Sequence, residues 1–76
     1  MNLKKGDLIL LDPYFKLTPL ETLSFDHVWD TEQIALVLDY KIVYEYNCYY
    51  IEVLVHEKLY YANLDFHETK KWIKLN

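Results

Sequence analysis

The fold is decided by residues 33–55, QIALVLDYKIVYEYNCYYIEVLV, in which apolar and other side chains alternate along most of the length. From Ile34 to Tyr46 every even position carries an aliphatic or tyrosine side chain. A period of two is that of a β-strand, whose successive side chains point to opposite faces. We therefore expect the even positions 34–46 to face the core. A strand this long usually bends once, and residues 39–41 are the expected place.

A second strand follows directly. Asn47-Cys48 predicts a turn, because Asn tolerates left-handed backbone geometry. Beyond it the odd positions 49–55 carry Tyr, Ile, Val and Val, so this segment alternates as well. The short connection makes the two strands antiparallel. The even positions of the first strand and the odd positions of the second would together fill a small core.

Outward from this hairpin the remaining elements are short. The apolar run at 8–11 predicts a first strand. After the hairpin, residues 56–58 predict a turn and residues 59–64 a further strand, and residues 71–75 predict the last strand. Residues 65–68 have capping-box spacing, which indicates a short 3₁₀ or helical turn before the last strand. Residues 18–21 have the same spacing, so a helical turn at about 19–24 and an ordinary proline turn both remain open. The long segment 12–32 is otherwise predicted to be a loop.

These elements make one all-β domain spanning residues 1–76. The chain has 76 residues, 53% of them hydrophobic, which suits a single small globular domain. Five short strands are too few for a two-layer sandwich, and a small bent barrel closes a sheet with the fewest residues. The sequence therefore predicts a small five-stranded barrel with a long first loop.

Charge argues against general nucleic-acid binding. The formal net charge is −4, and all eight basic residues are lysines. Phosphate backbones are usually held by clustered Lys and Arg. The acidic excess lies in residues 7–32, with six acidic residues against Lys16. The C-terminal part is richer in lysine, which keeps a nucleic-acid-binding barrel as the alternative function; its surface would be Lys58, Lys70, Lys71, Lys74, Tyr60, Tyr61 and Trp72.

Cysteine content and hydropathy bear on the compartment. Cys48 is the only cysteine, so no intramolecular disulfide forms, as is usual in a reducing compartment. The apolar run at 8–11 is too short for a signal peptide or a membrane span. We expect a cytoplasmic protein that does not engage a membrane.

No constellation typical of an enzyme is present. Ser24, the only serine, lacks a Gly-x-Ser-x-Gly setting, and a single glycine leaves no phosphate-binding loop. The three histidines do not have the spacing of a zinc site. We expect no catalytic residue, no metal and no cofactor, and hence a non-enzymatic protein.

Aromatic residues are the better clue to function. They make up 17% of the chain, more than a small core needs. Strand neighbours face opposite sides, so Tyr50 and at least one of Tyr60 and Tyr61 point away from the core. Exposed Tyr and Trp are enriched at protein interfaces, and long loops on rigid scaffolds often carry function. The predicted partner-binding residues are Tyr14, Phe15, Asp26, Trp29, Asp30, Glu32, Tyr50, Tyr60 and Tyr61.

The order of elements resembles a known family. The segments 4–9 (KKGDLI), 35–38 (ALVL), 50–55 (YIEVLV) and 71–75 (KWIKL) are similar to strands of Src-homology-3-like small barrels, and the layout resembles short barrel proteins of tailed bacteriophages. The resemblance implies a phage-encoded protein in the host cytoplasm or in a virion. Its partner would be a host or virion protein, which it inhibits or helps to assemble; a homo-oligomer is also open.

The departures from that family limit what is transferred. Ala35 stands where the second strand usually has Gly, Val55 replaces a Trp, and Glu57-Lys58 replaces the usual Asp-Gly hairpin. The acidic, Trp-bearing loop that binds proline-rich peptides has no clear counterpart, so that activity is not expected.

Overall fold

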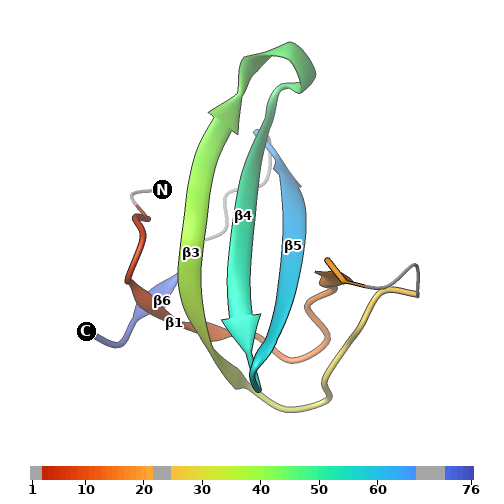
Figure 1. Cartoon of the computed structure of the whole chain (residues 1–76), viewed down its shortest axis with the longest axis vertical. Coiled ribbons are helices and arrows are strands. Elements are labelled where there is room, and N and C mark those ends of the chain that lie inside the picture. Colours follow the sequence, from red (N-terminus) through yellow and green to blue (C-terminus); the bar gives the residue numbers. More distant parts are fainter. Residues whose placement is uncertain (1–2, 22–24, 67–71) are drawn as a thin grey trace.

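A computed structural model describes residues 3–21, 25–66 and 72–76, and almost all of its regular structure is β (Figure 1). Six strands form one antiparallel sheet in the order β2-β5-β4-β3-β1-β6. The elements are β1 (Leu8–Leu11), β2 (Thr18–Pro19), β3 (Gln33–Val43), the 3₁₀ turn η1 (Tyr44–Tyr46), β4 (Cys48–Val55), β5 (Lys58–Asp65) and β6 (Ile73–Lys74).

The all-β prediction is confirmed, and the strand pairing adds detail. The sheet has six strands instead of five, because Thr18 and Pro19 pair with Tyr61 and Tyr60 of β5. Within the described residues the pairing leaves the sheet open, with β2 and β6 at its two edges. The radius of gyration, 11.8 Å, is close to the ~11.4 Å expected for a compact domain of this length.

A β-bulge in β3 divides the strand into two halves that face opposite ways. Val37 pairs with Val53 and Asp39 pairs with Glu52, so one extra residue, Leu38, is inserted between them. The prediction that all even positions 34–46 face the core is therefore wrong before the bulge. There Val37 is buried, whereas Ile34 is 60% exposed. The prediction is also wrong at the end of the segment, where Tyr44 and Tyr46 lie in η1 and are 75% and 76% exposed.

The odd phase of β4 is confirmed, since Ile51, Val53 and Val55 are buried. β1 and β5 also contribute buried side chains to the core. The buried core comprises Leu3, Ile9, Leu11, Leu17, Ala35, Val37, Ile51, Val53, Val55, Tyr60, Ala62 and Leu64. Phe15, Trp29, Tyr40 and Trp72 pack against this core from its margins.

The hairpin turns follow the residue types in part. Asn47 has φ 51° after η1, as its left-handed tolerance predicts. His56 and Glu57 both have positive φ, the geometry of a two-residue type I′ hairpin turn. Of the predicted turn at about 19–24, Pro19 lies in β2 and residues 22–24 lie outside the described residues. Of that at 65–68, Asp65 ends β5 and residues 67–68 lie outside the described residues.

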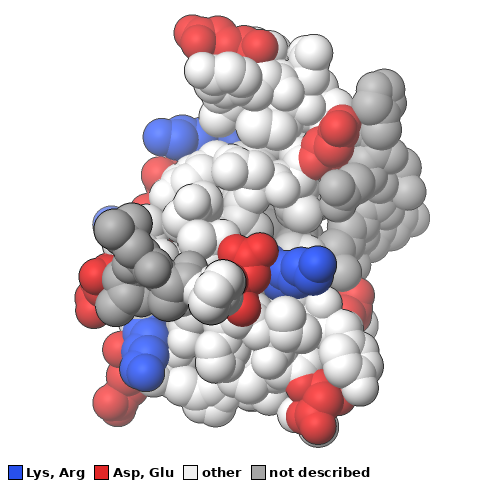
Figure 2. All heavy atoms as spheres, turned by 90° about the vertical axis from the view of Figure 1, so that its right-hand side faces the viewer, with Lys and Arg blue, Asp and Glu red and all other residues white. Residues whose placement is uncertain are grey.

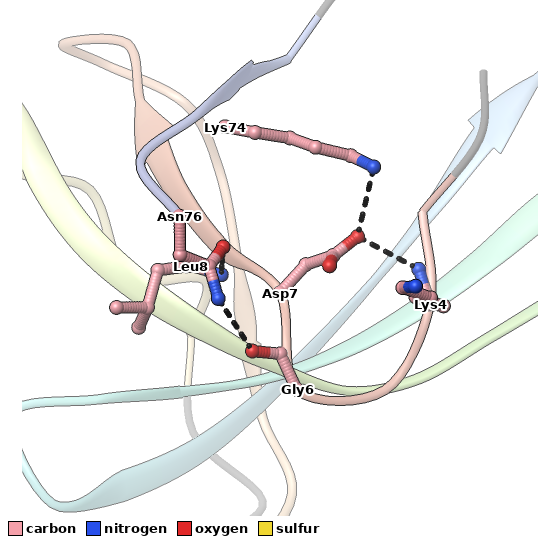
Figure 3. Close-up of polar contacts among 6 residues, drawn as sticks. All are labelled: Lys4, Gly6, Asp7, Leu8, Lys74 and Asn76. Atoms are coloured by element: carbon pink, nitrogen blue, oxygen red, sulfur yellow. Dashed lines mark hydrogen bonds and ion pairs between the residues drawn. The ribbon is translucent and has the colours of Figure 1, made fainter.

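A polar cluster joins the two ends of the described chain (Figure 3). The buried Asp7 carboxylate accepts a 3.0 Å hydrogen bond from the Lys4 backbone N–H and lies 3.3 Å from the Lys74 Nζ. Asn76 accepts from the Leu8 N–H and donates to the Gly6 carbonyl. The pKa of Asp7 is lowered, chiefly by the Lys4 hydrogen bond and also by Lys74, against the opposing effect of burial. This carboxylate is thus held in a structural role, as part of the attachment of β6 to β1.

Candidate functional site: the 12–32 loop and its surroundings

In the long loop predicted at 12–32, the described residues 12–21 and 25–32 form two antiparallel arms. Leu17 and His27 exchange two backbone hydrogen bonds of 3.0 and 2.7 Å. Near one end of the arms the Tyr14 N–H donates to the Trp29 carbonyl at 2.7 Å. Near the other end the Thr18 hydroxyl lies 2.8 Å from a carboxylate oxygen of Asp26. The backbone at 14–18 and 26–29 is therefore fixed, and so are the positions from which the side chains of these residues project.

Trp29 attaches this loop to the sheet. Its half-buried indole lies edge-on to Tyr60, with ring centroids 5.4 Å apart, and Tyr60 is only 4% exposed. The rings of His27 and His56 flank the indole at 4.4 and 6.0 Å. The nearest nitrogen of His56 lies 2.6 Å from the Gln33 side-chain oxygen. Trp29 and Tyr60, both predicted to bind a partner, thus pack against each other at the margin of the core.

Tyr14 is held in a conformation that a bulky residue seldom adopts. Asp12-Pro13-Tyr14-Phe15 is a tight turn closed by the Phe15 N–H to the Asp12 carbonyl, 3.3 Å. Tyr14 has φ 65° at the third position, where a type II turn normally has Gly or Asn. Its side chain is nevertheless 69% exposed. Strained positions of this kind often belong to functional sites. Phe15, the next residue, instead turns inward and meets Trp72 edge-on at 5.1 Å.

The outer surface of the loop combines apolar and acidic side chains. Phe25 is 96% exposed, and Leu20 and Val28 are also exposed. The exposed acidic residues are Asp12, Glu21, Asp26, Asp30 and Glu32. Figure 2 views the molecule from the side on which the loop lies in Figure 1, and its acidic groups are scattered over a largely uncharged surface. Phe25 is absent from the nine predicted residues, although its place in an aromatic loop was a signal for it.

Tyr50 and Tyr61 lie beside the loop, on the face of the sheet that points away from the core. Their rings stack with centroids 5.9 Å apart, and the Lys41 ammonium lies 5.0 Å from the Tyr50 ring centre. Partial burial raises the pKa of Tyr50, with a further contribution from Glu52. Since Tyr61 pairs with Thr18 of β2, this stack adjoins the base of the loop. The structure therefore separates the neighbours Tyr60 and Tyr61, with the first in the core and the second on the surface.

A third surface was missed by the sequence reasoning. Leu8, Leu36, Leu54 and Leu59 pair in register across β1, β3, β4 and β5, on the face opposite the core. The signal for it was present in the uninterrupted apolar runs at 8–11 and 34–38, because strands without alternation are typical of sheets covered on both faces.

Two further properties of the described residues concern metal binding and membrane crossing. Among residues 3–21, 25–66 and 72–76, no group of three or more His, Cys, Asp or Glu side chains could hold a metal ion. In the same part of the chain no helix has the length and apolar character needed to cross a membrane. Comparison of the chain with protein-family models, curated proteins and solved structures finds no match.

Proposed function

We propose that this chain is a non-enzymatic protein-binding module, and that the 12–32 loop is its binding surface. The observation that carries the proposal is Tyr14, which is exposed on a strained backbone that the surrounding hydrogen bonds hold in place. Left-handed geometry disfavours a tyrosine and would suit glycine. A tyrosine there is best explained by a task outside the domain.

Phe25 supports the same surface. A phenylalanine with 96% of its area in water gives nothing to the fold, whereas an aromatic side chain buried by a partner contributes strongly to binding. The exposed acidic residues around it would favour a partner with a basic rim and would speed association. Tyr50 and Tyr61 extend the proposed surface beyond the loop.

The class of partner and the finer fold belong to the same proposal. From the resemblance to short phage proteins, we propose a host or virion protein as the partner. We also propose that the sheet curls in the manner of Src-homology-3-like barrels. Support for the curled sheet comes from the one-sided core and from β1 and β6, which cross behind the lower part of β3–β5 in Figure 1.

The alternative of nucleic-acid binding has less support. Of its proposed surface, Tyr60 is buried, and Lys74 forms an ion pair with Asp7. Lys70 and Lys71 lie outside the described residues. Among the described residues, no position of a lysine or aromatic side chain favours nucleic-acid binding over protein binding.

Affinity capture with a matched variant tests the proposal. Tagged wild-type protein and a Tyr14→Gly, Phe25→Ala variant are each incubated with lysate of infected and uninfected host cells, and retained proteins are quantified by mass spectrometry. We expect a specific protein retained by the wild type and reduced at least about tenfold by the variant, as for loss of interface hot spots. Tyr46→Ala removes an equally exposed aromatic ring at the distant hairpin tip and should retain the partner.

Two results would contradict the proposal. One is equal retention by the wild type and the loop variant, which would move the binding surface elsewhere. The other is the absence of any protein enriched over a column without the chain. Because Tyr14→Gly suits the backbone, loss of binding through unfolding is checked by circular dichroism and is not expected.

A further inference from the structure

Beyond the bulge, the outer face of the sheet carries a small group of aromatic and charged side chains. The register pairs Asp39 with Glu52, and Glu52 with Tyr61. In the next row Lys41 pairs with Tyr50. Cross-strand partners lie on the same face of a sheet, with their Cβ atoms about 4.5–5.5 Å apart. These five side chains are therefore neighbours, and we call them the acidic-aromatic surface.

The rings of this surface already bind one cation, which the chain itself supplies. Tyr50 and Tyr61 stack with centroids 5.9 Å apart, and the Lys41 ammonium lies 5.0 Å from the Tyr50 ring centre. The face of an aromatic ring attracts a cation at this distance. Partial burial raises the pKa of Tyr50, and Glu52 and Asp39 add to that effect. The field of both carboxylates thus reaches the ring that holds the ammonium.

The two carboxylates, in contrast, have no cation of their own. Asp39 and Glu52 are half-buried, and neither side chain forms an ion pair or a hydrogen bond with any of the described residues. Two like charges in direct opposition weaken an antiparallel pair, and partly buried charges are screened less by salt than exposed ones. The isolated chain therefore loses some stability here, which a cation placed between the carboxylates would restore.

The chemistry of the neighbouring groups favours an arginine side chain as that cation. A guanidinium group is planar, stacks on aromatic faces and donates to carboxylates through a fork of N–H groups. A lysine ammonium is a point charge, and that of Lys41 lies over a ring without pairing with either carboxylate. An arginine stacked on Tyr61 has the carboxylate of Glu52 beside it and that of Asp39 in the same row.

We propose that the acidic-aromatic surface receives an arginine of the partner protein, whose guanidinium stacks on Tyr61 and pairs with Glu52 and Asp39. This inference deepens the proposed function and rests on it for the partner being a protein. The surface continues into the loop, because Tyr61 pairs with Thr18, whose hydroxyl donates to the exposed carboxylate of Asp26. A partner with one arginine and a basic rim can therefore contact the sheet and the loop together.

Titration of the isotopically labelled full chain with two short peptides tests the arginine site directly. The probes are acetyl-Gly-Arg-Gly-amide and the matched acetyl-Gly-Lys-Gly-amide, followed by two-dimensional NMR in low salt. We expect the arginine peptide to cause saturable shifts of the amides of residues 39–41, 50–52 and 61. The lysine peptide should bind at least about fivefold more weakly, because it cannot stack and fork at once. Glu52→Gln should weaken arginine binding at least about fivefold, since it removes a charge-assisted hydrogen bond.

Glu45→Gln is the matched control. Glu45 is an exposed acid in η1 at the hairpin tip, and its replacement changes the net charge by the same amount. This variant should bind the arginine peptide like the wild type. Three results would overturn the inference: no saturable shift at these amides, equal binding of the two peptides, or an equal loss of binding in Glu45→Gln and Glu52→Gln.

Lysate capture with the same variants separates this inference from the proposed function. If Glu52→Gln retains the partner as well as the wild type does, while the Tyr14→Gly, Phe25→Ala variant loses it, the loop binds the partner and the arginine inference is wrong. If no partner is captured but the arginine peptide binds as expected, the proposed function fails and the guanidinium site stands on the peptide result.

Discussion

Asp39 of β3 and Glu52 of β4 are direct cross-strand partners, so two carboxylates stand opposite each other on the outer face of the sheet. Lys41, the next residue of β3 on that face, lies over the Tyr50 ring. Both carboxylates also contribute, after partial burial, to raising the pKa of Tyr50. Like charges in direct opposition destabilise an antiparallel pair by about 0.2–1 kcal/mol.

Removing one of these charges should stabilise the domain. We expect Glu52→Gln to raise the free energy of unfolding by about 0.2–1 kcal/mol in low salt, measured by urea denaturation. The gain should shrink in high salt, which screens the repulsion. Glu45→Gln removes an acid in η1 at the hairpin tip and should have little effect. A loss of stability in Glu52→Gln would mean that Glu52 makes a favourable contact that outweighs the repulsion.

The bulge in β3 predicts opposite outcomes for two neighbouring aspartate substitutions. Val37→Asp should abolish folding, since it puts a carboxylate in the core at a cost of several kcal/mol, comparable to the whole stability of a small domain. Ile34→Asp should leave the monomer folded, because this side chain is largely exposed. Circular dichroism and thermal melting decide between them. A folded Val37→Asp protein would mean that the strand is displaced by one residue.

The sequence predicted most strands, and a bend near residues 39–41 that falls next to the observed bulge between Val37 and Asp39. It did not predict that the bulge reverses which residues face the core, and the reason is visible in β3. Residues 34–38 are all apolar, so their alternation does not say which face is buried. The odd residues Ala35 and Val37 point inward only because the inserted residue reverses the phase. β4 was predicted correctly since Glu52 and the turn residues fix its polar side. The strand β2 was not predicted, because a strand of two residues is too short to show any periodicity in the sequence.

The sequence located the candidate site in the 12–32 loop, but it did not tell which of the aromatic side chains there are exposed. An acidic, aromatic loop can be recognised from composition, and Tyr14 is indeed exposed. Which ring turns inward depends on tertiary contacts: Trp29 meets Tyr60, and Phe15 meets Trp72. The row Leu8-Leu36-Leu54-Leu59 was missed because it depends on the registers of four strands.

Trp29 is expected to contribute to stability, because its indole covers Tyr60 and the core margin. Full burial of a Trp makes truncation to Ala cost about 3–5 kcal/mol, so this half-buried ring should cost roughly 1–3 kcal/mol. Chemical denaturation of Trp29→Ala, followed by far-ultraviolet circular dichroism, measures it. Phe25→Ala, in the same loop, should change stability by less than about 0.5 kcal/mol. Equal effects of the two substitutions would contradict the assigned packing.

The Asp7 cluster should make stability depend on pH in the acid range. The folded chain holds the pKa of Asp7 below its ordinary value, so the folded state favours the ionised form. A lowered pKa gives a contribution that is complete above the unfolded pKa of about 4 and is lost as pH falls through the folded pKa. Unfolding free energies of wild type and Asp7→Asn, measured between pH 7 and pH 2.5, should therefore differ most near neutrality and converge in acid.

A second substitution separates the two partners of Asp7. Lys74→Gln removes the ion pair but leaves the hydrogen bond from the Lys4 backbone N–H, which is the larger cause of the lowered pKa. This variant should keep most of the acid dependence, whereas Asp7→Asn should lose the part that belongs to Asp7. If Lys74→Gln instead flattened the pH profile as fully as Asp7→Asn, the ion pair would be the main support of the carboxylate. The attachment of β6 to β1 would then rest on the Lys74 side chain more than on the turn that precedes β1.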